Sequence, residues 1–264
     1  MSEPTTTGPT VAVEAPDVPT PRGGLLDVAP ITSVTEHMAA GPVEYVGAPC
    51  GPAGLAPGMC CSAVTTDEIK TFDFPPTWCG GPYAVYKAVG CDILGEPYDA
   101  MALAALERGE GFAVEKAFRE EHLAGATVLA DGVCAAEGIG ILEQYAGENY
   151  AGRPVFHTNR YGAVVLGSKD VVFPGMDSPL TTILGTPVAA SAGLGDTGPD
   201  GTDAQPGEFW VYGTGHVHLY QSPVVATQGR DVETNQSIAL AERIWSATVE
   251  CFSVAVRIVT ECSS

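Results

Sequence analysis

Residues 97–123 read PYDAMALAALERGEGFAVEKAFREEHL and form the one run that is long and periodic enough for a major helix. Apolar side chains recur at helical spacing on one side of this run, and charged side chains occupy the other. Pro97 suits a first helical position, and Glu115 precedes Arg119 by four residues, the order that favours an ion pair. Gly109 would cost roughly 1 kcal/mol inside a helix. We therefore expect a long amphipathic helix with a segment pressed closely against it at Gly109, or a kink there.

The composition describes a folded but weakly charged chain. Of its 264 residues, 45% are hydrophobic, which is enough for one large or two small domains with a real core. The 32 acidic and 12 basic residues give a formal net charge of −20, which argues against nucleic-acid binding by phosphate neutralisation. Charged residues make up only 17%, beside 32 glycines and 21 prolines, so we expect neighbours to cover part of the surface.

Targeting signals and cysteine pairs are not evident. No apolar run approaches the roughly 18 residues of a membrane span, and the first residues lack the basic and apolar regions of a signal peptide. We therefore expect a protein made and kept in a cytoplasm, without a membrane partner. The eight cysteines include the adjacent pair Cys60 and Cys61, which has no metal-ligand spacing. Buried free thiols are the prediction for all eight.

The first 90 residues contain few periodic segments. Residues 1–40 show neither a strand nor a helix period, which predicts an extended arm outside the core that is ordered only in an assembly. Residues 41–62 carry Gly or Pro about every third position, which disfavours helices and interior strands. Short strands are expected at 63–74 and 83–88.

The elements after the long helix are shorter. Residues 133–150 place apolar residues on one face and predict a second helix. Asn159 is expected to cap a brief helix that continues through Leu166. The predicted strands are 154–157, 169–173, 180–194, 208–219 and a pair within 237–260.

Two parts of the C-terminal half carry alternatives. The loop 193–207 is rich in Gly, Asp and Pro and is long enough to suspect a role in function or contacts. Residues 238–245 fit a strand, with a helix as the competing prediction. Few long helices among many irregular strands indicate an α+β fold.

Candidate catalytic groups are scarce. His216 and His218 resemble a metal pair, but no acid or cysteine stands at ligand spacing, so a solvated strand face is expected. His157 fits a hydrogen-bonded core histidine, and residues 120–122 fit a charged helix end. Residues 193–201 lack the lysine of a phosphate-binding loop. We expect no enzyme, no catalytic residue, no bound metal and no cofactor.

Five runs of the sequence resemble a known protein family. They are ALERGEGFAVEKAF (105–118), ILEQYAGENYAGRPVFHTNRYGAVVL (141–166), LTTILGTPVAASAGL (180–194), WVYGTGHVHLYQSPV (210–224) and ALAERIW (239–245). In order and spacing, the chain resembles the major capsid proteins of tailed bacteriophages that infect actinobacteria, over roughly residues 95–260. Arg119-Glu120 stands where relatives have Trp-Thr, and Thr158-Asn159 stands where they have Met-Pro. The resemblance is therefore that of a distant member of the family.

The resemblance implies the Hong Kong 97 capsid fold, which encapsulin nanocompartments share. It assigns an N-terminal arm to 1–40 and an E-loop region to 41–90. It further assigns a peripheral domain to 91–130 and 236–264, with the spine helix at 97–123, and an axial domain to 131–235.

The resemblance also implies a function. The chain would self-assemble as pentamers and hexamers into an icosahedral shell that encloses phage double-stranded DNA without tight binding, in a virion assembled in the host cytoplasm. Portal and decoration proteins are implied partners, and the roughly 90 residues before the spine helix lead us to expect a separate scaffold protein or none. A cross-link would need Lys70 or Lys87 to meet Asn149, Asn159 or Asn235. The alternatives are an encapsulin-like compartment, a disulfide-stapled surface protein and an unrecognised enzyme.

Overall fold

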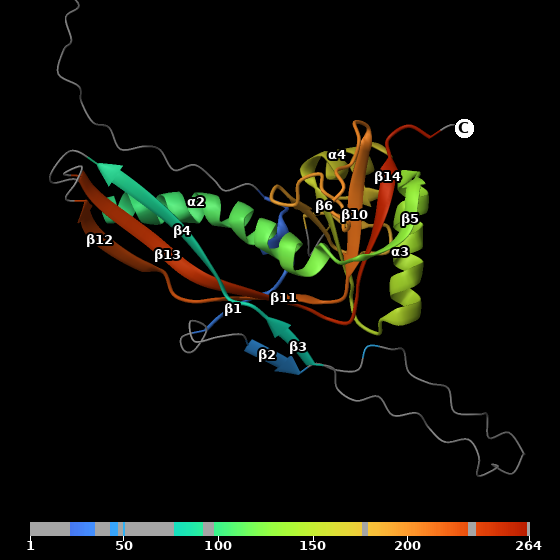
Figure 1. The fold of residues 1–264 in the computed structure, drawn as a ribbon. Helices are drawn as coiled ribbons and strands as arrows, with labels where there is room; N and C mark the ends of the chain where they lie inside the picture. The colour runs from blue at the N-terminus through green and yellow to red at the C-terminus, as the bar shows by residue number, and fades with distance from the viewer. Residues whose placement is uncertain are drawn as a thin grey trace, which may run out of the picture.

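The structure, a computed structural model, describes residues 22–34, 43–46, 50, 77–91, 98–175, 179–231 and 236–262. Its main elements are two five-stranded sheets and one long helix that packs on the first of them. Figure 1 shows this helix, α2, lying along the first sheet on one side of the molecule, with the second sheet and the other two long helices on the other side. This mixture confirms the α+β prediction.

The long helix begins and ends close to the predicted residues. α2 spans Tyr98–Phe118 and continues as a π-helical segment, η2, over Arg119–Leu123. Its apolar side, including Leu106, Val114 and Phe118, is fully buried. At Gly109, an added Cβ would lie 3.1 Å from Cε of Lys87. A close neighbour at this glycine, as expected from the sequence, is therefore confirmed.

The first sheet is built on one long strand. β13 (Gln236–Val249) pairs antiparallel with β4 (Tyr83–Cys91), with β12 (Val225–Asp231) and with β11 (Val217–Gln221), and β1 (Ile31–Ser33) pairs parallel with β11. α2 packs on β4 and β13, where Val85, Ala241 and Trp245 join its buried side chains in one core. Residues 238–245 are therefore a strand, and the competing helix is wrong.

The second sheet lies between two apolar layers. Its order is β5 (Thr127–Val133), β14 (Ser253–Val259), β10 (Glu208–Thr214), β6 (Val155–Asn159) and β9 (Val188–Ser191). Alternate residues of β10 face opposite cores, because Phe209 packs with α3 (Ala135–Asn149) and α4 (Arg160–Ser168) while Trp210 packs with the core of the first sheet. Asn159 caps α4 as predicted, with Oδ1 accepting from Gly162 N at 2.7 Å.

Small elements complete the described chain. They are α1 (Leu25–Val28), the antiparallel pair β2 (Val43–Val46) and β3 (Thr77–Gly80), and the antiparallel pair β7 (Val172–Phe173) and β8 (Thr181–Thr182). The strand expected at 63–74 lies outside the described residues. The strand expected at 169–173 is confined to β7, because Lys169 ends α4 and Asp170 has a left-handed φ of 54°.

The chain crosses between the two sheets at two adjacent turns. β10 leads through Gly215 and His216 into β11, and β13 leads through 250–252 into β14. A Cβ on Gly215 would lie 2.2 Å from the Glu250 carbonyl oxygen, and Glu250 N donates to His216 O at 3.0 Å. The single strand predicted for 208–219 is therefore wrong, since this close crossing divides it.

The crossings also move elements across the expected domain boundaries. β11 and β12 fall within 131–235 but pair in the first sheet, while β14 falls within 236–264 but pairs in the second. A division of the chain by sheet therefore differs from the expected domain boundaries at residues 131–235 and 236–264.

Two further expectations are corrected. Residues 22–34 are not outside the core, because Leu25 is fully buried and Ala29 is 5% exposed in the core of the first sheet. Free thiols are wrong for four cysteines, which form the disulfides Cys50–Cys251 and Cys134–Cys262. No described helix is both long and apolar enough to cross a membrane.

Candidate functional site

A buried carboxylate on α2 joins three segments of the chain. Glu115 is 5% exposed; Oε1 accepts from Leu25 N at 3.1 Å, and Oε2 accepts from Gly193 N at 2.9 Å. Two glycines allow this close approach to the helix. A Cβ on Gly24 would lie 2.1 Å from Glu115 Oε1, and a Cβ on Gly193 would lie 2.4 Å from the Phe112 carbonyl oxygen. Glu115 therefore holds α1 and the loop after β9 against the helix. The predicted pair with Arg119 is wrong, and Arg119 lies 3.8 Å from Glu120 instead.

An ion pair holds the same helix to the first sheet. Arg243 Nε on β13 lies 3.1 Å from Glu110 Oε2, and both side chains are largely buried. The Arg243 guanidinium also lies over the Trp245 ring, 5.8 Å from its centroid, and donates to Gln221 Oε1 at 2.5 Å. Burial raises the pKa of Glu110, and the charge of Arg243 opposes that rise. The pair fixes the orientation of α2 along β13.

Two histidines meet where α2 ends between the sheets. His122 and His157 each lie 5.2 Å from the Phe118 ring, centroid to centroid. Nε2 of His157 hydrogen-bonds Thr214 Oγ1 at 2.9 Å, as expected for a core histidine, and burial lowers the pKa of His157 to about 3. Burial also lowers the pKa of His122. Glu120 and Glu121 are exposed at the helix end, as expected from the sequence, whereas His122 is packed into the junction.

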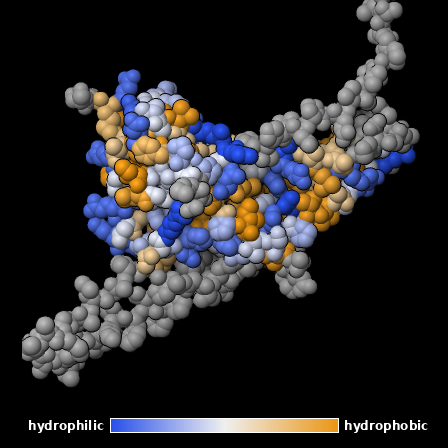
Figure 2. Space-filling model, turned by 180° about the vertical axis from the view of Figure 1, so that it is seen from behind, coloured by the Kyte–Doolittle hydropathy of each residue, from blue (hydrophilic) through white to orange (hydrophobic). Residues whose placement is uncertain are grey.

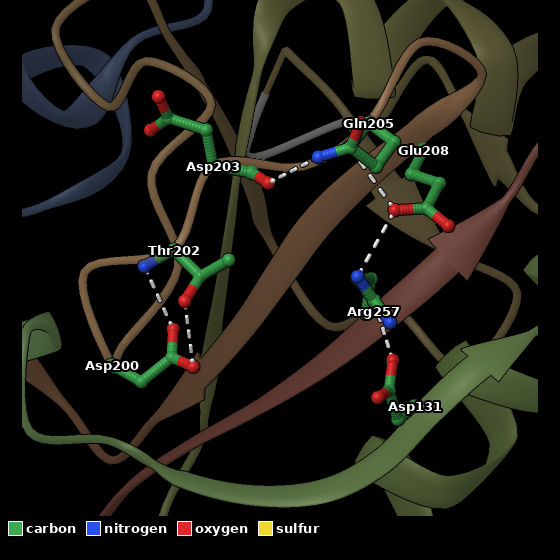
Figure 3. A network of polar contacts seen from close by, with 7 residues as sticks. All are labelled: Asp131, Asp200, Thr202, Asp203, Gln205, Glu208 and Arg257. Atoms are coloured by element: carbon green, nitrogen blue, oxygen red, sulfur yellow. Dashed lines mark hydrogen bonds and ion pairs between the residues drawn. The ribbon is translucent and has the colours of Figure 1, made fainter.

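An arginine bridges three strands of the second sheet. Arg257 on β14 pairs with Asp131 on β5 and lies 3.1 Å from Glu208 on β10 (Figure 3). Its guanidinium lies 5.9 Å from the centroid of the Trp210 ring. The side chain ties the strand edges together at the surface.

The loop 193–207 folds back on this sheet. Asp200 accepts from the backbone and hydroxyl of Thr202, and Gln205 N donates to Glu208 Oε2 at 3.1 Å (Figure 3). Tyr212 OH donates to Thr197 O at 2.9 Å. These are contacts of the loop with itself and with β10, so the loop has a structural role in the subunit.

The remaining candidate groups do not converge on a reaction centre. The rings of His216 and His218 are 6.3 Å apart, and His218 Nε2 hydrogen-bonds Thr32 Oγ1 at 2.7 Å. Among the described residues, no three His, Cys, Asp or Glu side chains are grouped to hold a metal ion. The sequence predicted no site residue of this kind, and it missed the buried contacts of Glu115 and the surface contacts of Arg257, which have no local pattern to mark them.

Large apolar side chains are exposed at several separate places. Figure 2 shows apolar residues interspersed with hydrophilic ones on the back of the molecule. Val164 on α4 is 72% exposed, and Ile183 and Leu184 in the turn after β8 are 84% and 74% exposed. The full set in the described ranges is Ile31, Tyr86, Met101, Phe112, Val128, Tyr161, Val164, Phe173, Ile183, Leu184 and Val225. Apolar residues exposed singly are normal on a protein surface, so the adjacent pair Ile183 and Leu184 is the part of this set that stands out.

Several described arginines make contacts within the subunit. Arg243 and Arg257 are in ion pairs, Arg153 donates to the Gly185 carbonyl oxygen and Arg160 donates to that of Arg22. The two ion pairs place a carboxylate beside each cation, whereas a hydrogen bond to a carbonyl oxygen leaves the arginine charge in place.

Comparison with known proteins places the fold. No protein-family model matches the sequence, and no curated protein matches it. Solved structures are similar over nearly the whole chain. The capsid of a native GTA particle is 11% identical, with a TM-score of 0.60 over 96% of each chain. The capsid of Ralstonia phage GP4 is 9% identical, with a TM-score of 0.59 over 98% of this chain and 97% of that one.

A shell protein of another kind is also similar. The holo-SrpI encapsulin complex from Synechococcus elongatus PCC 7942 is 13% identical, with a TM-score of 0.56 over 98% of this chain and 95% of that one. Phage capsids and an encapsulin therefore share the two-sheet, long-helix architecture described above. The chain has the Hong Kong 97 capsid fold.

Proposed function

We propose that this chain is the major capsid protein of a tailed bacteriophage, a structural subunit that self-assembles as pentamers and hexamers into an icosahedral shell around double-stranded DNA. The observation that carries the proposal is the similarity to phage and GTA capsid chains over at least 96% of this chain. Scaffold, portal and decoration proteins would be its partners, and the virion its location after assembly in a host cytoplasm.

The sheets suggest how the subunit is divided. The first sheet with α2 would be the peripheral domain and its spine, and the second sheet with α3 and α4 would be the axial domain. β2 and β3 would form the base of the E-loop. This assignment follows hydrogen-bonded strands, so it places β11 and β12 in the peripheral domain and β14 in the axial domain.

The exposed apolar residues support contacts between copies. An isolated subunit would leave Val164, Ile183 and Leu184 in water, whereas packing each against a neighbour would stabilise the assembly by roughly 25 cal/mol for every Å² of apolar surface covered. These residues lie on α4 and the β8 turn, which would face other axial domains.

The shell would hold DNA by confinement. The formal net charge is −20, and Arg243 and Arg257 are already paired with carboxylates. At about 0.15 M salt, the Debye length of about 8 Å leaves only close charges to act on phosphate. Few counterions would be released, so the affinity would be low.

One of the conceivable cross-links is disfavoured. The Asn159 side chain is 8% exposed and already donates to Gly195 O and Asp196 Oδ1 while capping α4. Lys87 is exposed, but its stem lies over Gly109. Asn149, which donates to Tyr145 O at the exposed end of α3, is the more accessible amide.

Electron microscopy of the purified protein tests the proposal. Closed or tubular shells with hexameric and pentameric units are expected, with or without a scaffold protein. A chain that stays monomeric in light scattering under every condition, including co-expression with a scaffold protein, would contradict it.

An encapsulin-like compartment is the second candidate, because the SrpI encapsulin complex is also similar over nearly the whole chain. The contents of shells separate the two candidates. Shells that close without a portal and retain a protein cargo through a terminal peptide would support the compartment. Shells that contain a portal and fill with DNA would support the capsid.

A further inference from the structure

Two pairs of cysteines connect distant parts of the chain. Cys50 is bonded to Cys251 and Cys134 to Cys262, with Cα atoms 5.5 and 5.9 Å apart, as in ordinary disulfides. The sequence separations are 201 and 128 residues. Both bonds end on the second sheet, one at the turn before β14 and one at the start of α3.

Two of these cysteines stand where the backbone favours another residue. Cys251 has a φ of 67°, in the left-handed region that favours glycine. Cys134 is the N-cap of α3 but makes no side-chain cap, a position where Ser, Thr, Asp or Asn is preferred. Because other residues would suit the local structure better, what a cysteine adds at each position is its sulfur.

Contacts that do not involve sulfur bring each pair together. Ala151 N donates to Cys50 O at 3.0 Å, and Tyr150 OH donates to Glu250 Oε2 at 2.7 Å beside Cys251. β14 pairs parallel with β5, with Ile258 opposite Val133, so the chain beyond β14 runs close to Cys134 at the start of α3. The fold can therefore position both pairs as thiols before either bond forms.

The sulfur-bearing residues are also accessible. Cys50, Cys134 and Cys251 are half-buried, and Cys262 is exposed. A small oxidant can reach such thiols, whereas fully buried thiols are inert.

We propose that the two pairs are an oxidative lock on the finished shell, an inference that rests on the proposed function. Subunits would fold and assemble as dithiols in a reducing cytoplasm and oxidise after release from it. One disulfide would attach residue 50, which precedes residues 51–76, to the second sheet. The other would attach the C-terminal end to the same sheet.

The chemistry needs a low-molecular-weight disulfide such as oxidised glutathione as the oxidant. A thiolate of each pair attacks the oxidant and forms a mixed disulfide, and one molecule of glutathione leaves. The second cysteine then displaces the other glutathione. Formation of each protein disulfide thus removes two protons and two electrons from the cysteine thiols. The protons and the electrons pass to the two glutathione thiols that are released.

The test uses the full chain, expressed in a reducing cytoplasm and harvested in N-ethylmaleimide to trap free thiols. Peptide maps should show all four cysteines alkylated at harvest. Shells assembled in reductant and then treated with oxidised glutathione should yield the linked peptides 50–251 and 134–262. The oxidised shells should persist to a higher guanidinium concentration than shells kept in reduced glutathione.

Cys251→Gly and Cys134→Ser are the informative variants, because each suits its backbone position better than cysteine. Each should assemble like the reduced wild-type protein, form only the remaining bond and gain less resistance on oxidation. Pairs already linked at harvest, or oxidised wild-type shells no more resistant than the oxidised variants, would overturn the lock. Electron microscopy under reducing conditions scores assembly separately. Absence of shells there contradicts the proposed function and the lock with it, whereas normal shells that gain nothing from oxidation contradict the lock alone.

Discussion

Glu115 has an unusual position for a charged residue. A carboxylate is expensive to bury, and two backbone N–H donors, from Leu25 and Gly193, offset that cost here. Those donors come from segments 90 and 78 residues away in sequence. The two hydrogen bonds therefore offset the cost of burying Glu115, and they also fix where the two remote segments lie on the helix.

Glu115→Gln should destabilise the subunit by about 1–3 kcal/mol, because the amide group has only one acceptor and would leave one buried N–H unpaired. Glu107→Gln is the matched control on the exposed side of the same helix and should change the free energy of unfolding by less than about 0.5 kcal/mol. Urea unfolding followed by circular dichroism measures both. Equal effects of the two variants would show that the Glu115 contacts contribute nothing.

His157 makes stability depend on pH. The unfolded chain binds a proton near pH 6.5, whereas burial lowers the pKa of the folded His157 to about 3. The unfolded state therefore binds more protons as the pH falls from about 6.5 towards 3, and the folded state loses stability across that window. We expect this group to lower the free energy of unfolding by roughly 3 kcal/mol between pH 7 and pH 4.

His157→Phe should lose less stability than the wild-type protein between pH 7 and pH 4. Thr214 Oγ1 keeps the carbonyl oxygens of Val155 and Gly215 as partners after the change. Urea midpoints at the two pH values measure the difference, with His216→Asn as a control that retains His157. A wild-type loss that the His157 variant reproduces in full would place the acid sensitivity elsewhere.

At the scale of elements, the short helix α4 has one side that packs in the core and another that is exposed. Leu166 is fully buried in the second core, while Val164 is 72% exposed. If neighbouring copies cover Val164, a charge there will remain in water in the free subunit but will be buried unpaired in the shell.

Val164→Asp should therefore abolish shell formation while the free subunit unfolds within about 0.5 kcal/mol of the wild-type protein. Gln144→Asp, on the exposed side of α3, is the control and should still assemble. Particle yield by electron microscopy and urea unfolding of subunits give the two readings. Normal shells from the Val164 variant would exclude α4 from the subunit contacts.

The elements that the sequence predicted well have strong local signals. α2 and α3 carry helical periodicity, and Asn159 is a recognisable cap. The failures came from contacts between remote segments. The break between β10 and β11 depends on Gly215 meeting Glu250, and the burial of Leu25 depends on a core assembled from α2 and the first sheet. Neither partner is visible within a local window.

At the scale of the whole molecule, the resemblance supplied the architecture that composition and periodicity could not. Charge and composition argued against phosphate neutralisation and a membrane span, and they led us to expect a surface covered by neighbours. They could not select pairs among the eight cysteines, because the pairing Cys50–Cys251 follows from a turn between two sheets. Connectivity of this kind is fixed by tertiary structure.

The charge balance predicts weak binding of isolated capsomers to linear DNA at about 0.15 M salt, because the 12 basic residues stand beside 32 acidic ones. A salt series followed by fluorescence anisotropy measures it. Tight binding that weakens steeply as salt rises would contradict confinement and would point to a basic inner face assembled from several subunits. The wild-type subunit with free DNA of mixed sequence is sufficient for this test.

The long strand β13 gives the subunit a mechanical property. Nine residues of β13, from Ser237 to Trp245, are in register with β4, and its other edge is paired with β12 and β11. Tension applied along the strand would load these ladders in shear, so that many hydrogen bonds would resist together, whereas a pull across the strands would unzip them one after another. The direction of a force, as much as its size, would decide whether the first sheet yields.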